Sequence, residues 1–93
     1  MVNINDKTGV IEQLRKMLTN HPEKKHYMLN VSVISSKDNS LIGRDEFEIY
    51  TNHPVHKITR KVTKLRKEGG ICSLNIEELV EKAEGKYILI LSV

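Results

Sequence analysis

The chain has 93 residues, of which 39% are hydrophobic and 29% are charged, and its formal net charge is +3. This length and composition fit one globular domain over residues 1–93, with residues 1–6 as a leader that need not be ordered. The lone cysteine, Cys72, excludes an internal disulfide framework. The polar start lacks a signal-peptide pattern, and the longest apolar run is far below the ~20 residues that cross a bilayer. We therefore expect an intracellular, cytoplasmic protein without membrane contact.

The first predicted element is a helix over about residues 8–19. Apolar residues recur at helical spacing from Val10 to Leu18, and polar residues lie between them. Asp6 or Thr8 is a candidate cap, and the segment 20–22, Asn-His-Pro, is expected to end the helix because the residue before proline avoids the helical region.

Two strands are predicted next, over residues 26–35 and 41–50. Apolar and polar residues alternate with period two in both segments, and the polar segment 36–40 between them is typical of a hairpin turn. Asp45 would lie on the apolar side of the second strand. A bulge near Gly43 or an edge position would resolve that conflict.

Residues 54–70 predict a basic amphipathic helix, entered through Asn52 or His53 as cap and ended at Gly69-Gly70. At 100° per residue, the apolar side chains of this helix share one side; they are Val55, Ile58, Val62 and Leu65. Residues 55–67 carry six Lys or Arg and no acid. Because β-branched residues and repelling cations weaken this helix, we expect packing against a sheet to hold it.

The remaining segments predict a short strand at 71–73, a third helix over 76–84 begun by Asn75, and a last strand over 86–93. The expected fold is therefore α+β in two layers, in the order α-β-β-α-(β)-α-β. Its sheet would be mostly antiparallel, with three to four strands, and three helices would pack on it.

The basic helix is the leading candidate site. Cations on one helix face can follow a phosphate backbone, so we expect a non-enzymatic protein that binds nucleic acid, DNA or RNA, or another polyanionic surface. The residues assigned to this binding are His56, Lys57, Arg60, Lys61, Lys64 and Lys67.

A competing interpretation depends on the acidic segment that follows. Residues 68–84 carry five Glu against one Lys. If helix 76–84 lay beside the basic helix, Glu77, Glu78, Glu81 and Glu84 would neutralise the basic face. The alternative function is then a small protein-interaction regulator or inhibitor, of the compact kind that mobile elements encode, that docks on a protein with an acidic surface or through an apolar sheet face.

A second candidate surface is the sheet face turned away from the helices. It would expose apolar side chains, and contiguous apolar patches are uncommon on monomers. We expect a face for a homodimer or a partner there, made by Met28, Ile34, Ile42, Ile88 and Ile90.

Nothing in the sequence predicts catalysis, a metal or a cofactor. His53 and His56 have a spacing that two metal ligands can use, but a third ligand at a telling distance is missing. Cys72 has no identifiable base and is expected to be a buried thiol in a short strand.

Overall fold

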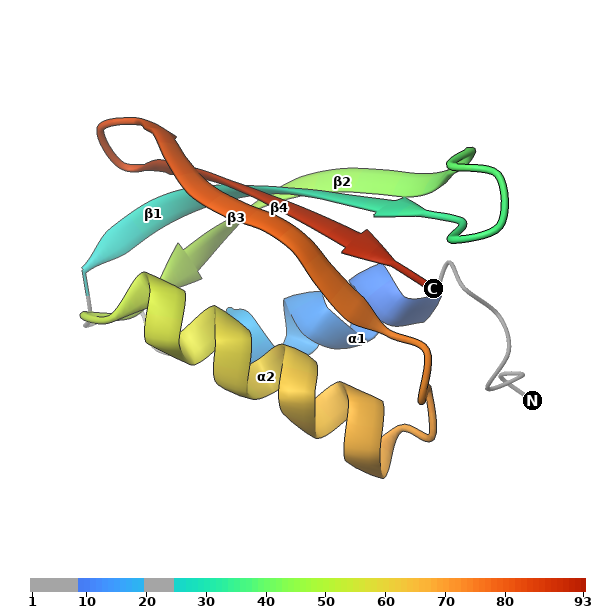
Figure 1. The fold of residues 1–93 in the computed structure, drawn as a ribbon. Helices are drawn as coiled ribbons and strands as arrows, with labels where there is room; N and C mark the ends of the chain where they lie inside the picture. Colours follow the sequence, from blue (N-terminus) through green and yellow to red (C-terminus); the bar gives the residue numbers. More distant parts are fainter. Residues whose placement is uncertain (1–8, 20–24) are drawn as a thin grey trace.

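A computed structural model describes residues 9–19 and 25–93. In these residues the element order is α1 (Gly9–Leu18), β1 (His26–Ile34), β2 (Leu41–Tyr50), α2 (Pro54–Glu68), β3 (Asn75–Ala83) and β4 (Lys86–Ser92). The strands form one sheet in the order β2-β1-β4-β3 (Figure 1). The α+β class and the strands and helix predicted over residues 26–35, 41–50, 54–70 and 86–93 are confirmed, and the helix predicted over about 8–19 is confirmed from Gly9 to Leu18. The predicted caps Asp6 and Thr8 and the stop at 20–22 lie outside the described residues.

The predicted third helix is wrong, because residues 75–83 form the edge strand β3. Ile76 and Leu79 pack against the core, as they would on a helix face. The register of β3 against β4 shifts between Ile76 and Glu78 and again between Glu81 and Ala83. Each extra residue breaks the period of two and imitates helical spacing. The hydrogen bonds with β4 therefore determine that residues 75–83 form a strand, although their sequence pattern favours a helix.

The sheet is mixed, so the prediction of a mostly antiparallel sheet is also corrected. The hairpins β1–β2 and β3–β4 are antiparallel, but the central strands β1 and β4 run parallel. A parallel pair needs a crossover, and α2 supplies it between the two hairpins. The predicted short strand at 71–73 is wrong as well, since these residues form a turn after α2.

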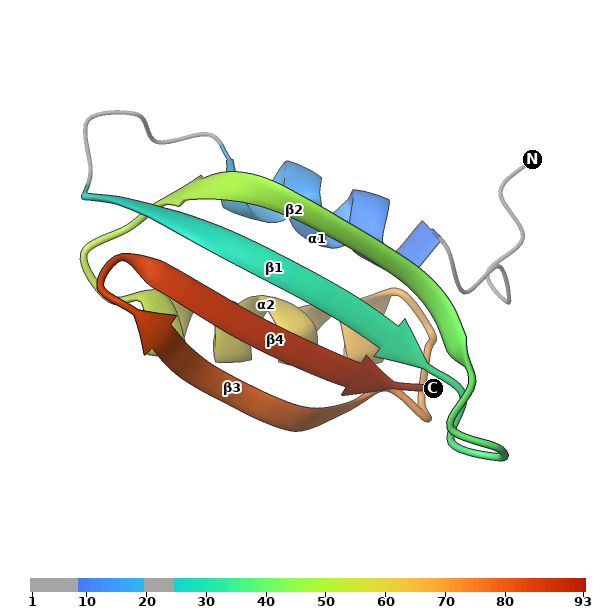
Figure 2. The same cartoon turned by 90° about the horizontal axis from the view of Figure 1, so that it is seen from above.

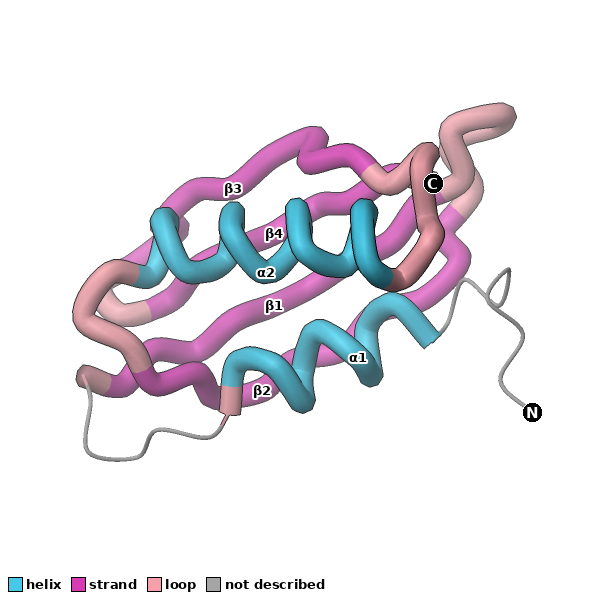
Figure 3. Tube along the Cα trace, turned by 90° about the horizontal axis from the view of Figure 1, so that it is seen from below, coloured by secondary structure: helices cyan, strands magenta, loops and turns pink. Residues whose placement is uncertain are grey.

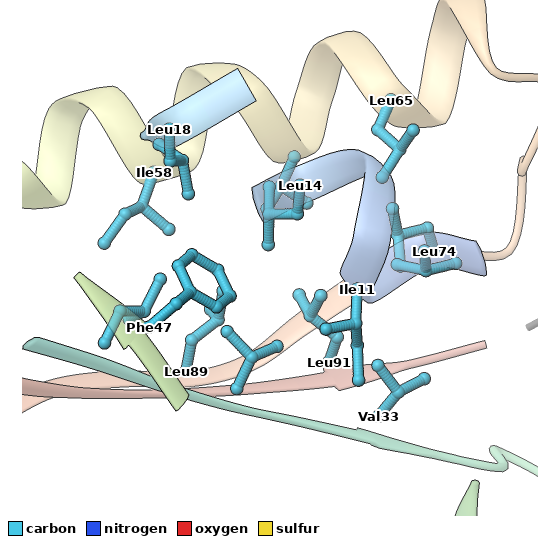
Figure 4. Close-up of a cluster of buried hydrophobic side chains, with 14 of the residues drawn as sticks. Ile11, Leu14, Leu18, Val33, Phe47, Ile58, Leu65, Leu74, Leu89 and Leu91 are labelled. Atoms are coloured by element: carbon cyan, nitrogen blue, oxygen red, sulfur yellow. The ribbon is translucent and has the colours of Figure 1, made fainter. Parts of the chain in front are cut away.

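α1 and α2 lie side by side on one face of the sheet (Figure 3). No described element covers the other face, which Figure 2 shows from above with the helices behind it. We call this uncovered surface the open face. The core lies between the helices and the sheet, and Figure 4 shows its aliphatic character. Fully buried side chains come from every layer: Leu14, Leu18, Leu29, Val31, Ile58, Leu89 and Leu91.

Asp45 is accommodated by the position of β2 at the sheet edge. The register of β1 against β2 shifts beside Gly43, which confirms the predicted bulge. Arg15 of α1 reaches over the edge to within 3.4 Å of the Asp45 carboxylate, which stays about one third exposed. The helix-covered side of β2 therefore carries a charge only where solvent still reaches it.

Candidate nucleic-acid interface

Helix α2 begins at Pro54 and runs for 15 residues. The hydroxyl of Thr51 accepts a hydrogen bond from the backbone N–H of His53 at 3.0 Å, and the carbonyl of His53 accepts the first helical bond from Lys57 at 2.9 Å. His53 is thus the N-cap by position, although its side chain makes no capping bond. Proline fits the first turn because an N–H at that position would have no acceptor within the helix.

The end of α2 is fixed by two glycines. The N–H of Gly69 bonds the carbonyl of Leu65 at 2.9 Å, and a Cβ at Gly69 would lie 2.5 Å from that oxygen. Gly70 then takes a φ of 74°, a conformation that glycine adopts without strain. The Nε of Arg66 donates to the carbonyl of Leu74, which ties the last turn to the start of β3. Both ends of the basic helix are therefore held in place.

The buried stripe of α2 consists of Pro54, Ile58, Val62 and Leu65. Val55 was expected in this stripe, but its side chain is 50% exposed. Pro54 takes the inward position one residue earlier, which turns Val55 out of the interface. Val55 therefore belongs to the solvent-exposed side of α2, and because it is uncharged the positive charge of that side is as predicted.

We call the outward side of α2 the basic face. Within it, His56, Arg60, Lys64 and Lys67 are exposed, and Lys57 and Lys61 are partly exposed at its flank. Lys57 also donates from Nζ to the carbonyl of Tyr50 at 3.3 Å. The predicted binding residues thus lie together on one rigid element, and Arg60, Lys64 and Lys67 follow one another at helical spacing of four and three residues.

Ion pairs between described residues join Arg15 to Asp45, Lys16 to Glu12 and His26 to Glu48. Arg60, Lys61, Lys64 and Lys67 take part in no ion pair within the described part of the chain. No carboxylate of the described residues lies close enough to these four side chains to neutralise them, so their positive charge is available to a ligand.

The glutamates of residues 77–84 do not form the acidic helix that would have neutralised the basic face. Glu77 accepts a hydrogen bond from the hydroxyl of Ser92 at 2.7 Å, and Glu81 accepts one from the N–H of Gly85 at 3.1 Å. Glu78 pairs in register with Ile90, and its side chain belongs to the open face. Glu84 lies in the turn between β3 and β4. The carboxylates are divided among the hairpin turn, Ser92 and the far side of the sheet.

His53 and His56 line a shallow hollow at the start of α2, together with Val55 and Tyr87. Burial, more than the nearby Glu81, raises the pKa of the Tyr87 phenol. In residues 9–19 and 25–93, no three His, Cys, Asp or Glu side chains gather as a metal site would require. Cys72 is exposed in the turn after α2, which corrects the expectation of a buried thiol in a strand.

The residues predicted for the second surface divide between two environments. Met28, Ile34, Ile88 and Ile90 lie on the open face and are partly buried. Ile42, at the bulge of β2, packs instead against the core. The same bulge turns Leu41 onto the open face opposite Ile34, with 60% of its side chain exposed. The alternation of the sequence could not show this exchange, because an inserted residue reverses the parity of the strand.

No protein-family model, curated protein or solved structure matches the chain. Neither described helix combines the length and the apolar character that crossing a membrane requires.

Proposed function

We propose that this protein is a non-enzymatic nucleic-acid-binding module that holds the phosphate backbone on the basic face of α2. The observation that carries the proposal is the exposed row Arg60, Lys64 and Lys67, whose charges take part in no ion pair within the described residues. Lys57 and Lys61 flank the row and extend the positive field. A rigid helix presents these cations together, so binding does not have to order a loop first.

The chemistry of this face favours contact with phosphates over reading of bases. Its long side chains end in ammonium and guanidinium groups, which position a protein on a nucleic acid without reporting sequence. The tyrosines that could stack on bases already have partners within the chain. Tyr27 and Tyr87 contact each other edge to face at 5.5 Å, and the Tyr50 hydroxyl donates a hydrogen bond to Glu48. We therefore expect binding that depends on charge and tolerates sequence changes.

A protein with an acidic surface would use the same face, and the test separates the two. The first variant carries Arg60→Glu and Lys64→Glu on the basic face. A matched control carries Lys37→Glu, in the turn between β1 and β2, and Lys82→Glu, near the end of β3, and so changes the net charge equally. Circular dichroism confirms that both variants fold.

We expect the affinity for short duplex DNA and RNA to fall at least about tenfold for the first variant and little for the control. Equal losses would contradict a role for this face, since net charge alone would then explain binding. If the wild type bound neither polymer but co-purified with one stoichiometric, nuclease-insensitive protein, the regulator or inhibitor function would replace the proposal.

A further inference from the structure

We propose that the open face is the interface of a twofold dimer of this chain, with the symmetry axis parallel to the strands. This inference does not rest on the proposed function. The dimer would place the two sheets at its centre and leave α1 and α2 of each copy on the outside, so that each basic face stays accessible.

The centre of the open face carries the aliphatic side chains Ile88 and Ile90 of β4. On β1 their neighbours in register are Asn30 and Ser32, with Met28 and Ile34 diagonal to them, and Val80 of β3 lies beside Ile88 and is 41% exposed. Strand β4 is apolar on both sides, but the helices cover only one of them. A strand with this pattern is typical of a sheet covered on both faces, so the open face has the character of a contact surface.

The charges around this centre disfavour a polyanion as its occupant. Register places Glu46, Glu48 and Glu78 on the open face, against Arg44 and Lys86. Phosphates would meet more negative than positive groups here. The occupant therefore needs aliphatic side chains beside small polar ones, with mixed charges around them, as a second copy of the same face has.

The strand register makes the face complementary to itself. Arg44 pairs with Ser32, Ser32 with Ile90, and Ile90 with Glu78, so Arg44 and Glu78 lie at the same level on opposite edges of the sheet. A twofold axis parallel to the strands lays β2 of one copy over β3 of the other at that level. Arg44 then meets Glu78 of the second copy, and symmetry makes this ion pair twice.

A second row supports the same axis. Glu48, Met28 and Lys86 share a level, so the rotation lays Lys86 over Met28 of the other copy and next to its Glu48. In the single row between these two, Ile88 lies over Asn30 and Val80 over Glu46, and in the row of Arg44 and Glu78, Ile90 lies over Ser32. An axis perpendicular to the strands at the level of Glu46 would instead lay β2 over itself and bring the two Glu46 side chains together, which like-charge repulsion disfavours.

The size of the face sets the expected strength. Four strands about 4.8 Å apart and seven residues at about 3.3 Å make roughly 450 Å² of flat sheet per copy. This area belongs to the lower range of specific interfaces, for which we expect a dissociation constant in the micromolar range.

Sedimentation equilibrium of the full chain across the micromolar range tests the proposal. We expect a monomer–dimer equilibrium for the wild type. Arg44→Glu and Glu78→Arg should each weaken the dimer by about tenfold or more, because each puts like charges face to face. The two single variants mixed in equal amounts should form a heterodimer, since each contact between positions 44 and 78 of the mixed pair then joins a glutamate to an arginine.

Ile90→Lys tests the apolar centre, and Val55→Lys is its control, because Val55 is a half-exposed aliphatic residue on the helix side. Only Ile90→Lys should abolish the dimer, with both variants folded by circular dichroism. A wild type that stays monomeric would overturn the proposal without touching nucleic-acid binding. So would a dimer indifferent to Ile90→Lys, or a mixture of the charge variants that fails to associate.

Discussion

Arg15 of α1 and Asp45 of β2 form an ion pair of 3.4 Å at the sheet edge, with side chains 55% and 35% exposed. The same guanidinium lies 5.9 Å from the centre of the Phe47 ring. The guanidinium of Arg15 thus faces both the Phe47 ring and the Asp45 carboxylate, and this dual contact explains how an acidic residue persists on the helix-covered side of β2.

We expect the coupling free energy between Arg15 and Asp45 to be below about 1 kcal/mol, because solvent screens a pair this exposed. A double-mutant cycle with Arg15→Met and Asp45→Asn, read by urea unfolding, measures it. Methionine keeps much of the apolar stem of Arg15 but removes its charge. A coupling above about 2 kcal/mol would mean that the pair is far less solvated than its exposure indicates.

Helix α2 should depend on packing rather than on its own helical preference. Ile58→Ala deletes fully buried atoms and should cost about 2–5 kcal/mol of unfolding free energy. Val55→Ala, on the same helix but half exposed, should cost less than about 1 kcal/mol. Urea unfolding compares them. Equal losses would show that Val55 is packed and that the buried stripe is assigned wrongly.

The conformation of residues 75–83 can be tested by the sign of one substitution. Val80→Ala should destabilise a strand by up to about 1 kcal/mol, whereas in an exposed helix it would stabilise by up to about 0.7 kcal/mol. Val80→Thr keeps the β-branched shape and should stay close to the wild type. Measurements at low protein concentration keep association out of the comparison. A stabilising Val80→Ala would restore the helix that the sequence pattern suggests.

The turn between β1 and β2 contains a pH-sensitive contact. Hydrogen bonds from the hydroxyl and the N–H of Ser40 to Asp38, at 2.7 and 3.0 Å, hold the pKa of this carboxyl below its ordinary value. Because the folded-state pKa is lowered, the contact stabilises the turn above the ordinary carboxyl pKa, and the stabilisation is lost as the pH falls through the folded value.

Ser40→Ala should therefore move the pKa of Asp38 upward, towards its ordinary range, as followed by NMR of the Asp38 carboxyl carbon. The substitution leaves the backbone bond in place, so the movement should be partial. An unchanged pKa would mean that the hydroxyl contact is absent in solution.

The parts of the fold that the sequence predicts well have one consistent local pattern. The alternation in residues 26–34 and the helical spacing from Val10 to Leu18 agree with the burial of those side chains. β4 is apolar on both sides and accordingly lies at the sheet centre, next to β1. In these segments local pattern and tertiary environment favour the same structure.

The parts of the fold that could not be predicted depend on contacts between segments that lie apart in the sequence. Bulges in β3 let Ile76 and Leu79 face the core at helical spacing, so the segment reads equally well as a helix. For the candidate site, the cations of α2 follow from spacing alone. The lack of ion pairs at Arg60, Lys61, Lys64 and Lys67 within the described residues does not follow from spacing. It depends on the hydrogen bonds that Ser92 and Gly85 donate to Glu77 and Glu81.

The salt dependence of duplex binding by the wild-type protein tests the role of the basic face most directly. If four or five cations of α2 contact phosphates, log affinity should fall with log salt at a slope near −4, or about 100- to 500-fold between about 50 and 200 mM salt. Arg60→Glu with Lys64→Glu should make the slope shallower by about 2. No binding at low salt, or a slope that these substitutions leave unchanged, would contradict the proposed function.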